Sequence, residues 1–217
     1  MPAIIAADKQ WNLGLTAAIG DQGATVPGLA AEKAGLNIEG IAILPPDGSP
    51  SGQAIGLVGL RNPLAADGRA IVLQVRNIAA AASGQEAPDL GDPVLLDLAG
   101  LGIRDLAWSA GARSLLILAG STGAGETFAL YRQNGWPIGP LKKLADIQDL
   151  HAEVVVASGS SRVLLLSDDG DTLRPVADKD ECKKKSFSDG QCLCKGLKGA
   201  AAEHKSFRGR WVEIDSK

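Results

Sequence analysis

The chain has 217 residues, of which 45% are apolar and 22% are charged, and its formal net charge is −3. These values are typical of a globular chain with a sizeable core, and they exclude disordered and fibrous classes. The small net charge gives no reason to expect nucleic acid or an anionic membrane as a partner. The longest apolar runs, such as SLLILAG (114–120), are too short to span a bilayer.

Residues 1–34 have weak patterning and form a separate N-terminal segment with room for a short helix. They contain no basic stretch followed by a long apolar run, so the sequence predicts no secretory signal. The expected location is therefore the cytoplasm, or outside it if the chain is a fragment of a longer exported precursor.

From residue 35 onward, short apolar segments recur in three units, each with tight turns such as PPDGSPSGQ or AGAR. Short strands joined by Gly-rich turns, without a helical period, predict antiparallel sheets. The first unit has LNIEGIAIL (36–44), AIGLVGLR (54–61), RAIVLQVR (69–76) and PVLLDLAG (93–100); the second has LGIRDLAWS (101–109), SLLILAGS (114–121) and FALYRQ (128–133); the third has LHAEVVVAS (150–158), RVLLLSDDG (162–170) and FRGRWVEID (207–215).

A repeated small sheet whose second strand is almost wholly apolar indicates blades that pack face to face. Residues 35–217 are therefore predicted to be an all-β, β-propeller-like domain of about three four-stranded antiparallel blades, with a β-sandwich as the alternative. Propellers typically have four to eight blades, so three cannot close a ring. The domain is expected to be a fragment, an open arc, or part of a ring completed by self-association.

Polar residues recur at one place in the opening strand of each unit. Asn37 and Glu39 align with Gly102 and Arg104, and again with His151 and Glu153. Inner strands line a propeller channel, so Glu39, Arg104 and Glu153 are expected to converge there, with Asp105 beside them. Such a group could bind Ca²⁺ or a cationic or hydroxylated ligand, or it could be an ion-paired structural network.

Three further residues are candidate ligand contacts. Arg61 ends a strand in GLRNPL (59–64), where its guanidinium could bind an anion or pair with a neighbouring blade. Asp168 and Asp169 precede a glycine in SDDG (167–170), which favours a tight turn or a carboxylate pair at a channel mouth.

The insertion at 178–206 is rich in Lys and Cys and is expected to extend from the surface. Cys182, Cys192, Cys194 and His204 could together bind Zn²⁺. The alternatives are one disulfide with an odd thiol, or three reduced surface cysteines.

Several motifs, in order along the chain, resemble the bacterial family known as domain of unknown function 3616. They are GLNIEGIA, GLRNPL, RAIVLQV, LDLAGLGIRDL, LLILAGSTG, FALYR, VLLLSDDG and FRGRWVEI, and they cover roughly residues 35–170 and 205–215. This resemblance implies a β-propeller-like domain without an established activity. The segment IEGIA (38–42) is also distantly similar to blade strands of phytase-like esterase propellers, which implies that Glu39 would lie near a calcium-bearing channel.

The predicted function is a module that binds a small ligand or a protein, without established catalysis. The alternative is a calcium-dependent hydrolase of the phytase-like esterase or phosphatase kind. SGSSR (158–162) fits a hairpin turn better than the strand-to-helix elbow of a serine hydrolase.

Overall fold

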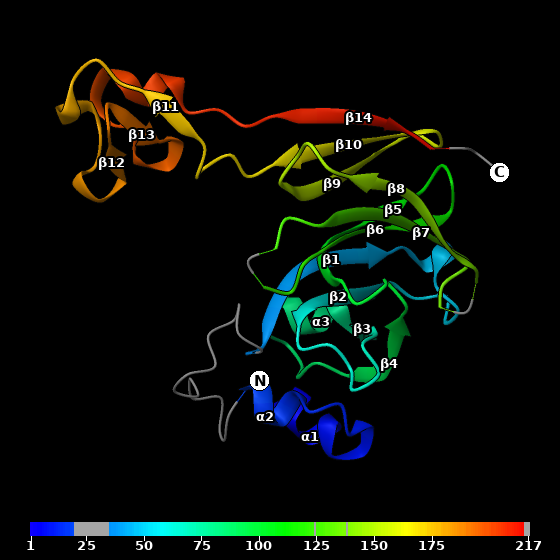
Figure 1. Cartoon of the computed structure of the whole chain (residues 1–217). Helices are drawn as coiled ribbons and strands as arrows, with labels where there is room; N and C mark the ends of the chain where they lie inside the picture. Colours follow the sequence, from blue (N-terminus) through cyan, green and yellow to red (C-terminus); the bar gives the residue numbers. More distant parts are fainter. Residues whose placement is uncertain (20–34, 124, 138, 215–217) are drawn as a thin grey trace.

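The computed structural model describes residues 1–19, 35–123, 125–137 and 139–214. Across these residues the fold is all-β apart from short helices, and its sheets are antiparallel with three or four strands each (Figure 1). The sheets follow one another as blades that do not close into a ring. The predicted fold class, an incomplete propeller-like arrangement, is confirmed.

Three sheets form the stack and are named blades 1, 2 and 3 in chain order. Each blade begins with its inner strand, β1, β5 or β9, and adds its further strands outward in chain order. Blade 1 comprises β1 (Asn37–Leu44), β2 (Ile55–Asn62), β3 (Ala70–Val75) and β4 (Leu90–Leu96); blade 2 comprises β5 (Gly102–Ser109), β6 (Ser114–Gly120), β7 (Phe128–Asn134) and β8 (Leu141–Ile147); blade 3 comprises β9 (Ala152–Ser158), β10 (Arg162–Ser167) and β14 (Gly209–Glu213).

Blade 2 is the centre of the stack, and its second strand explains the apolar runs in the sequence. Every residue of β6 is buried, because blade 1 covers one face of the sheet and blade 3 covers the other. Leu115 and Ile117 belong to the core shared with blade 1, whereas Leu116 and Leu118 belong to the core shared with blade 3. An all-apolar strand is what a sheet covered on both faces requires.

A glycine allows blades 1 and 2 to approach closely. A Cβ atom at Gly59 would lie 2.5 Å from Cγ2 of Ile103, too short for any real contact. The small residue on β2 therefore makes room for a large side chain on β5, which is the interlocking expected of a well-packed interior.

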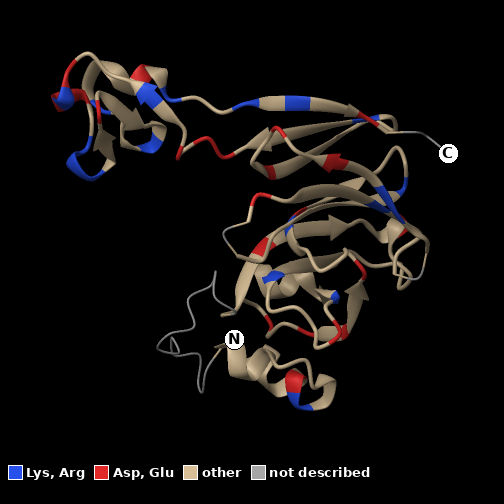
Figure 2. Ribbon diagram, viewed as in Figure 1, with Lys and Arg blue, Asp and Glu red and all other residues tan. Residues whose placement is uncertain are grey.

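The chain leaves blade 3 after β10 and returns to it as β14, and the intervening residues form a small lobe. The lobe contains the three-stranded sheet β11 (Leu173–Pro175), β13 (Gln191–Leu193) and β12 (Phe187–Ser188), with short 3₁₀ helices at Lys179–Glu181, Lys184–Ser186, Cys194–Gly196 and Gly199–His204. Its core is small and consists largely of cysteines. Many of the Lys and Arg residues of the chain lie on this lobe, which projects from the stack (Figure 2).

Helices cover part of the outer face of blade 1. Helix α1 (Pro2–Trp11) and helix α2 (Leu15–Ile19) pack there, with Leu15 fully buried among residues of β2 and β3. Helix α3 (Ile78–Ala82), between β3 and β4, places Ile78 against Gly56 of β2. A short 3₁₀ helix, Pro46–Gly48, follows β1.

The strands differ from the predicted ones at three places. The fourth strand of blade 1 spans Leu90–Leu96 instead of 93–100, and β8 (Leu141–Ile147) was not predicted. Blade 3 has three strands instead of four. The insertion predicted at 178–206 lies within the small lobe, which begins earlier, at β11.

Candidate functional site

A β-bulge interrupts the inner strand of every blade. The pairing of β1 with β2 skips Glu39, that of β5 with β6 skips Arg104, and that of β9 with β10 skips Glu153. A bulge adds one unpaired residue to a strand and re-aims its side chain. The three polar residues aligned from the sequence are therefore the extra residues of three equivalent bulges.

The bulges bring the three side chains together. Nη1 of Arg104 lies 3.0 Å from Oε2 of Glu39 and 3.1 Å from Oε1 of Glu153. The Arg104 side chain is 4% exposed, whereas Glu39 and Glu153 are 23% and 25% exposed. One buried cation thus lies between two partly hydrated carboxylates, as the structural alternative for this group required.

Arg61 and Asn37 extend this network on the side of blade 1. Nη1 of Arg61 donates to Oε1 of Glu39 at 3.0 Å, and Nδ2 of Asn37 donates to the same oxygen at 2.9 Å. Arg61 also donates to the carbonyl oxygens of Ser121 and Gly123 at 3.1 and 2.6 Å. These bonds tie blade 1 to the segment after β6, so Arg61 contacts a neighbouring blade.

Burial raises the pKa of Glu153, and the nearby Glu39 carboxylate adds to this, while Arg104 opposes it. The guanidinium of Arg104 also lies over the ring of Phe128, 5.4 Å from the ring centre. A cation over an aromatic face gains electrostatic stabilisation. The network therefore continues from the bulges to the aromatic side chain at the start of β7.

Asp105 lies outside this network, although it follows Arg104 directly. Its carboxylate accepts hydrogen bonds from the backbone N–H groups of Leu106 and Val155, both at 2.8 Å. Burial raises the pKa of Asp105, and the two hydrogen bonds oppose that rise. Because Val155 belongs to β9, Asp105 joins blade 2 to blade 3.

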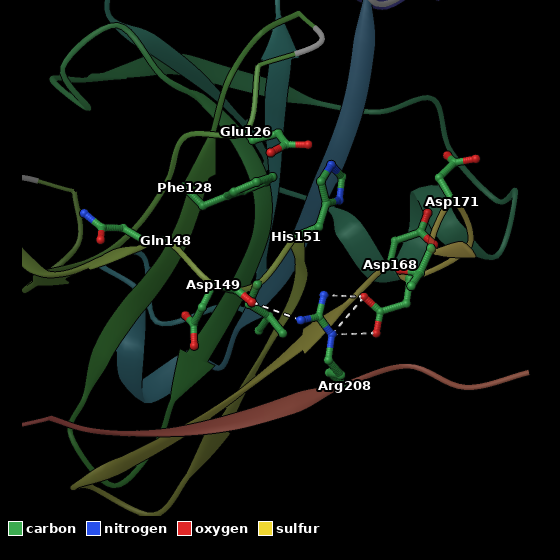
Figure 3. Close-up of a pocket in the computed structure, with 11 residues that line it drawn as sticks. Glu126, Phe128, Gln148, Asp149, His151, Asp168, Asp171 and Arg208 are labelled. Atoms are coloured by element: carbon green, nitrogen blue, oxygen red, sulfur yellow. Dashed lines mark hydrogen bonds and ion pairs between the residues drawn. The ribbon is translucent and has the colours of Figure 1, made fainter. Parts of the chain in front are cut away.

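A pocket of about 440 Å³ opens where blades 2 and 3 meet the start of the small lobe (Figure 3). Its lining residues come from the start of β7 and the segment before it, the β8–β9 connection, the turn after β10 and the segment that leads into β14. They are Glu126, Phe128, Gln148, Asp149, Leu150, His151, Asp168, Asp169, Asp171, Thr172 and Arg208. The charged side chains of the lining are predominantly acidic.

His151 links the pocket to the charged network. Its ring packs edge-on against Phe128, with centroids 4.9 Å apart, and its Nδ1 lies 3.4 Å from Oε1 of Glu153. This nitrogen is buried and has no hydrogen-bond partner among the described residues. The imidazole therefore lies between Glu153 and the open pocket.

The two aspartates of the SDDG segment have different environments. Asp169 is buried and held by Arg208, whose Nη2 lies 2.8 Å from Oδ1 and whose Nε lies 3.0 Å from Oδ2. The hydrogen bonds from Arg208 lower the pKa of Asp169. Asp168 accepts a hydrogen bond from the N–H of Gly170 at 2.7 Å, as an aspartate does in a tight turn.

The cysteines adopt the disulfide alternative. Cys182 and Cys192 form a disulfide, and Cys194 is a buried free thiol beside Ser206. His204 is exposed and lies near Glu203. Cys182, Cys192, Cys194 and His204 therefore do not form a zinc site in the structure, because two of the predicted ligands are bonded to each other.

Over the described ranges, no cluster of three or more His, Cys, Asp or Glu side chains has an arrangement that could hold a metal ion. In the same part of the chain, no helix is long and apolar enough to cross a membrane. The sequence did not identify Glu126, Phe128, Asp149 or Arg208 as site residues, since they come from three separate segments whose proximity depends on how the blades pack.

Comparison with known proteins identifies one family. The family described as "Protein of unknown function (DUF3616)" matches residues 18–163, more than half of the chain. No curated protein and no solved structure matches this sequence. The resemblance identified from the sequence motifs is thereby confirmed.

Proposed function

We propose that this chain, which belongs to the DUF3616 family, is a binding module whose acidic pocket takes a small cationic ligand. The observation that carries the proposal is the charge of the pocket lining. Five carboxylates, from Glu126, Asp149, Asp168, Asp169 and Asp171, face one guanidinium, from Arg208.

The size and shape of the pocket support binding of a small molecule. Its volume of about 440 Å³ lies within the range of pockets that bury small ligands. Phe128 and Leu150 supply apolar surface to the lining, and Arg208, which Asp169 holds, lies away from Phe128 in the pocket (Figure 3). An aromatic face beside carboxylates suits a ligand with a charged nitrogen and a short apolar body.

The pocket carboxylates differ in how far they are already neutralised. Asp169 is paired with Arg208, Asp149 with Arg210 and Asp171 with Lys195. Glu126 and Asp168 take part in no ion pair described in the structure, and both line the pocket. We therefore assign the main ligand contacts to these two side chains.

Thermal unfolding with a panel of probes tests this assignment. Spermidine and arginine are the cationic probes, inositol is the neutral polyol, and inorganic phosphate is the anion. A cationic probe at ten times its dissociation constant should add about 1.4 kcal/mol of stability, which raises Tm by about 3–6 °C for a chain of this size. Phosphate should give no such shift.

Matched variants locate the site. Glu126→Gln and Asp168→Asn should each weaken binding of the cationic probe about tenfold, whereas Asp92→Asn, at an exposed acid on β4, should leave it unchanged. An equal shift in all three variants would place the probe elsewhere. The absence of any shift with cationic probes at millimolar concentration would refute the proposal.

The calcium-dependent hydrolase alternative gains no support from the pocket. Among the described residues, no group of three or more His, Cys, Asp or Glu side chains is arranged to hold a metal ion, and the pocket lining includes neither serine nor cysteine. Calcium is added to the probe panel as a direct test of this alternative. A rise in Tm with calcium that EDTA reverses, and that Glu39→Gln abolishes, would favour the hydrolase.

The disulfide also bears on where the chain works. Disulfides persist in oxidising compartments and are rare in the cytoplasm, so the Cys182–Cys192 bond favours the exported alternative. We expect one reactive thiol per chain after unfolding of the native protein without reductant. Three reactive thiols would instead support a cytoplasmic location.

A further inference from the structure

Residues of each inner strand fall into two sets, one on the face toward the next blade and one on the face toward the preceding blade. The forward positions face the next blade and are Gly40 and Ala42 on β1, Asp105 and Ala107 on β5, and Val154 and Val156 on β9. The backward positions face the preceding blade and are Ile38, Ile41 and Ile43 on β1, Ile103, Leu106 and Trp108 on β5, and Ala152, Val155 and Ala157 on β9. The three bulges place both sets in the same register.

The two internal junctions show how these positions meet. At the first, a Cβ atom on Gly40 would lie 2.9 Å from Cγ2 of Ile103 and 3.0 Å from Cγ of Leu106. At the second, Asp105 accepts its hydrogen bond from the backbone of Val155, the residue equivalent to Leu106. The same forward position therefore contacts the same backward positions at both junctions.

At the two ends of the stack these positions are bare. Val154 and Val156 on the forward face of blade 3 are 40% and 43% exposed. Trp211 on β14 is 51% exposed and pairs with Leu164 beside Val156, so it extends the same face. This apolar surface corresponds to the surfaces that the next blade covers on blades 1 and 2.

The backward face of blade 1 is the matching surface. Ile38, Ile41 and Ile43 are 45%, 61% and 47% exposed, whereas the equivalent Ile103 and Leu106 of blade 2 are at most 3% exposed. One end of the stack thus presents a bare forward face and the other a bare backward face. A second copy of the chain carries the surface that each end lacks.

We propose that two copies associate head to tail and close a six-bladed ring, with Val154 and Val156 of each copy against Ile38 and Ile41 of the other. The number of copies follows from blade counting. Two copies give each bare face a partner, and the six blades that result lie within the four to eight blades of known propellers. A head-to-tail contact that closes on itself also avoids open-ended assembly.

The helices on blade 1 are compatible with this junction. Leu15 of α2 packs on Leu60, Ile71 and Leu73 of β2 and β3, so the helices cover the outer part of that face and leave β1 bare. Blade 3 has only three strands and lacks the outermost one. The proposed contact therefore rests on the inner strands, β9 of one copy and β1 of the other.

The mass in solution is the first test. Light scattering during size exclusion should give about 45 kDa, twice the 22.3 kDa of one chain. Ile41→Asp and Val154→Asp should each weaken the dimer at least a hundredfold and yield folded monomers, as circular dichroism would show. Leu173→Asp, at an exposed leucine on β11 in the small lobe, is the control and should remain dimeric.

A cysteine pair tests the geometry without a charged substitution. The double variant Ile41→Cys/Val154→Cys should form a covalent dimer on mild oxidation, whereas either single variant should not. A monomer at several hundred micromolar, or a dimer that survives both aspartate substitutions, would overturn the proposal. Covalent dimers of the single variant Val154→Cys would show a back-to-back contact and would overturn the ring as well.

Discussion

Replacing Arg104 with methionine should destabilise the fold mainly through the two carboxylates left behind. Removing one member of a buried ion pair typically costs about 3–5 kcal/mol. Glu39 and Glu153 are about a quarter exposed, and Glu39 keeps its bonds to Arg61 and Asn37, so part of that cost is relieved. We therefore expect a loss of about 2–3 kcal/mol at pH 7.5.

The dependence of this loss on pH separates electrostatics from packing. Burial already raises the pKa of Glu153, and removing Arg104 removes the neighbour that lowers it most. At pH 5 Glu153 of the variant takes up a proton more readily, so the penalty of its unpaired charge falls. Urea unfolding should therefore show a smaller loss at pH 5 than at pH 7.5.

Two companion variants sharpen the measurement. The triple variant Glu39→Gln/Arg104→Met/Glu153→Gln removes every charge of the central group and should recover at least half of the loss, because a neutral group leaves no unpaired ion. Arg113→Met breaks an exposed pair with Asp47 and should cost no more than about 0.5 kcal/mol. A loss for Arg104→Met below about 0.5 kcal/mol, or one that is equal at both pH values, would refute the reasoning.

Three further predictions concern the blade junctions. Folded wild type holds the proton of Glu153 more tightly than the unfolded chain does, so its stability should fall as pH rises from about 4.5 toward the raised pKa of Glu153. This fall should disappear in Glu153→Gln, and identical profiles of urea midpoint against pH for the two proteins would contradict the prediction. Asp105→Ala leaves two backbone N–H groups without their acceptor and should cost about 1–3 kcal/mol in urea unfolding, with Asp105→Asn intermediate. Gly59→Ala should cost about 1–3 kcal/mol through overpacking, and less in the background Ile103→Ala; equal costs in both backgrounds would show that the contact is not the cause.

The repeat could be read from the sequence because each blade begins with the same local pattern. An inner strand, a tight turn and an all-apolar second strand recur with one polar residue at the same offset. The reason for that offset, the bulge at Glu39, Arg104 and Glu153, is a feature of strand pairing. These residues could be aligned from the sequence alone, but the bulge that explains their common position could not be predicted from it.

The outer strands were harder to predict because solvent faces them. Strand β8 carries Lys142 and Lys143 at its exposed edge, so its pattern is that of a surface segment. Strand β4 contains Gly91 and Pro93, which look like a break, although an edge strand tolerates proline because its missing N–H can face solvent. Local composition therefore does not predict β4 or β8 correctly, since both strands are stabilised by pairing with a neighbouring strand.

The reason why the pocket could not be predicted is different. Glu126, Asp149 and Arg208 lie on three separate connections, and only the packing of blade 3 on blade 2 brings them together. Arg61 and Arg104 hold Glu39, and burial raises the pKa of Glu153. His151 lines the pocket and its Nδ1 lies 3.4 Å from Oε1 of Glu153, so one imidazole ring connects the pocket with this carboxylate. The network thus ties the blades together on the blade 1 side and adjoins the acidic pocket on the blade 3 side.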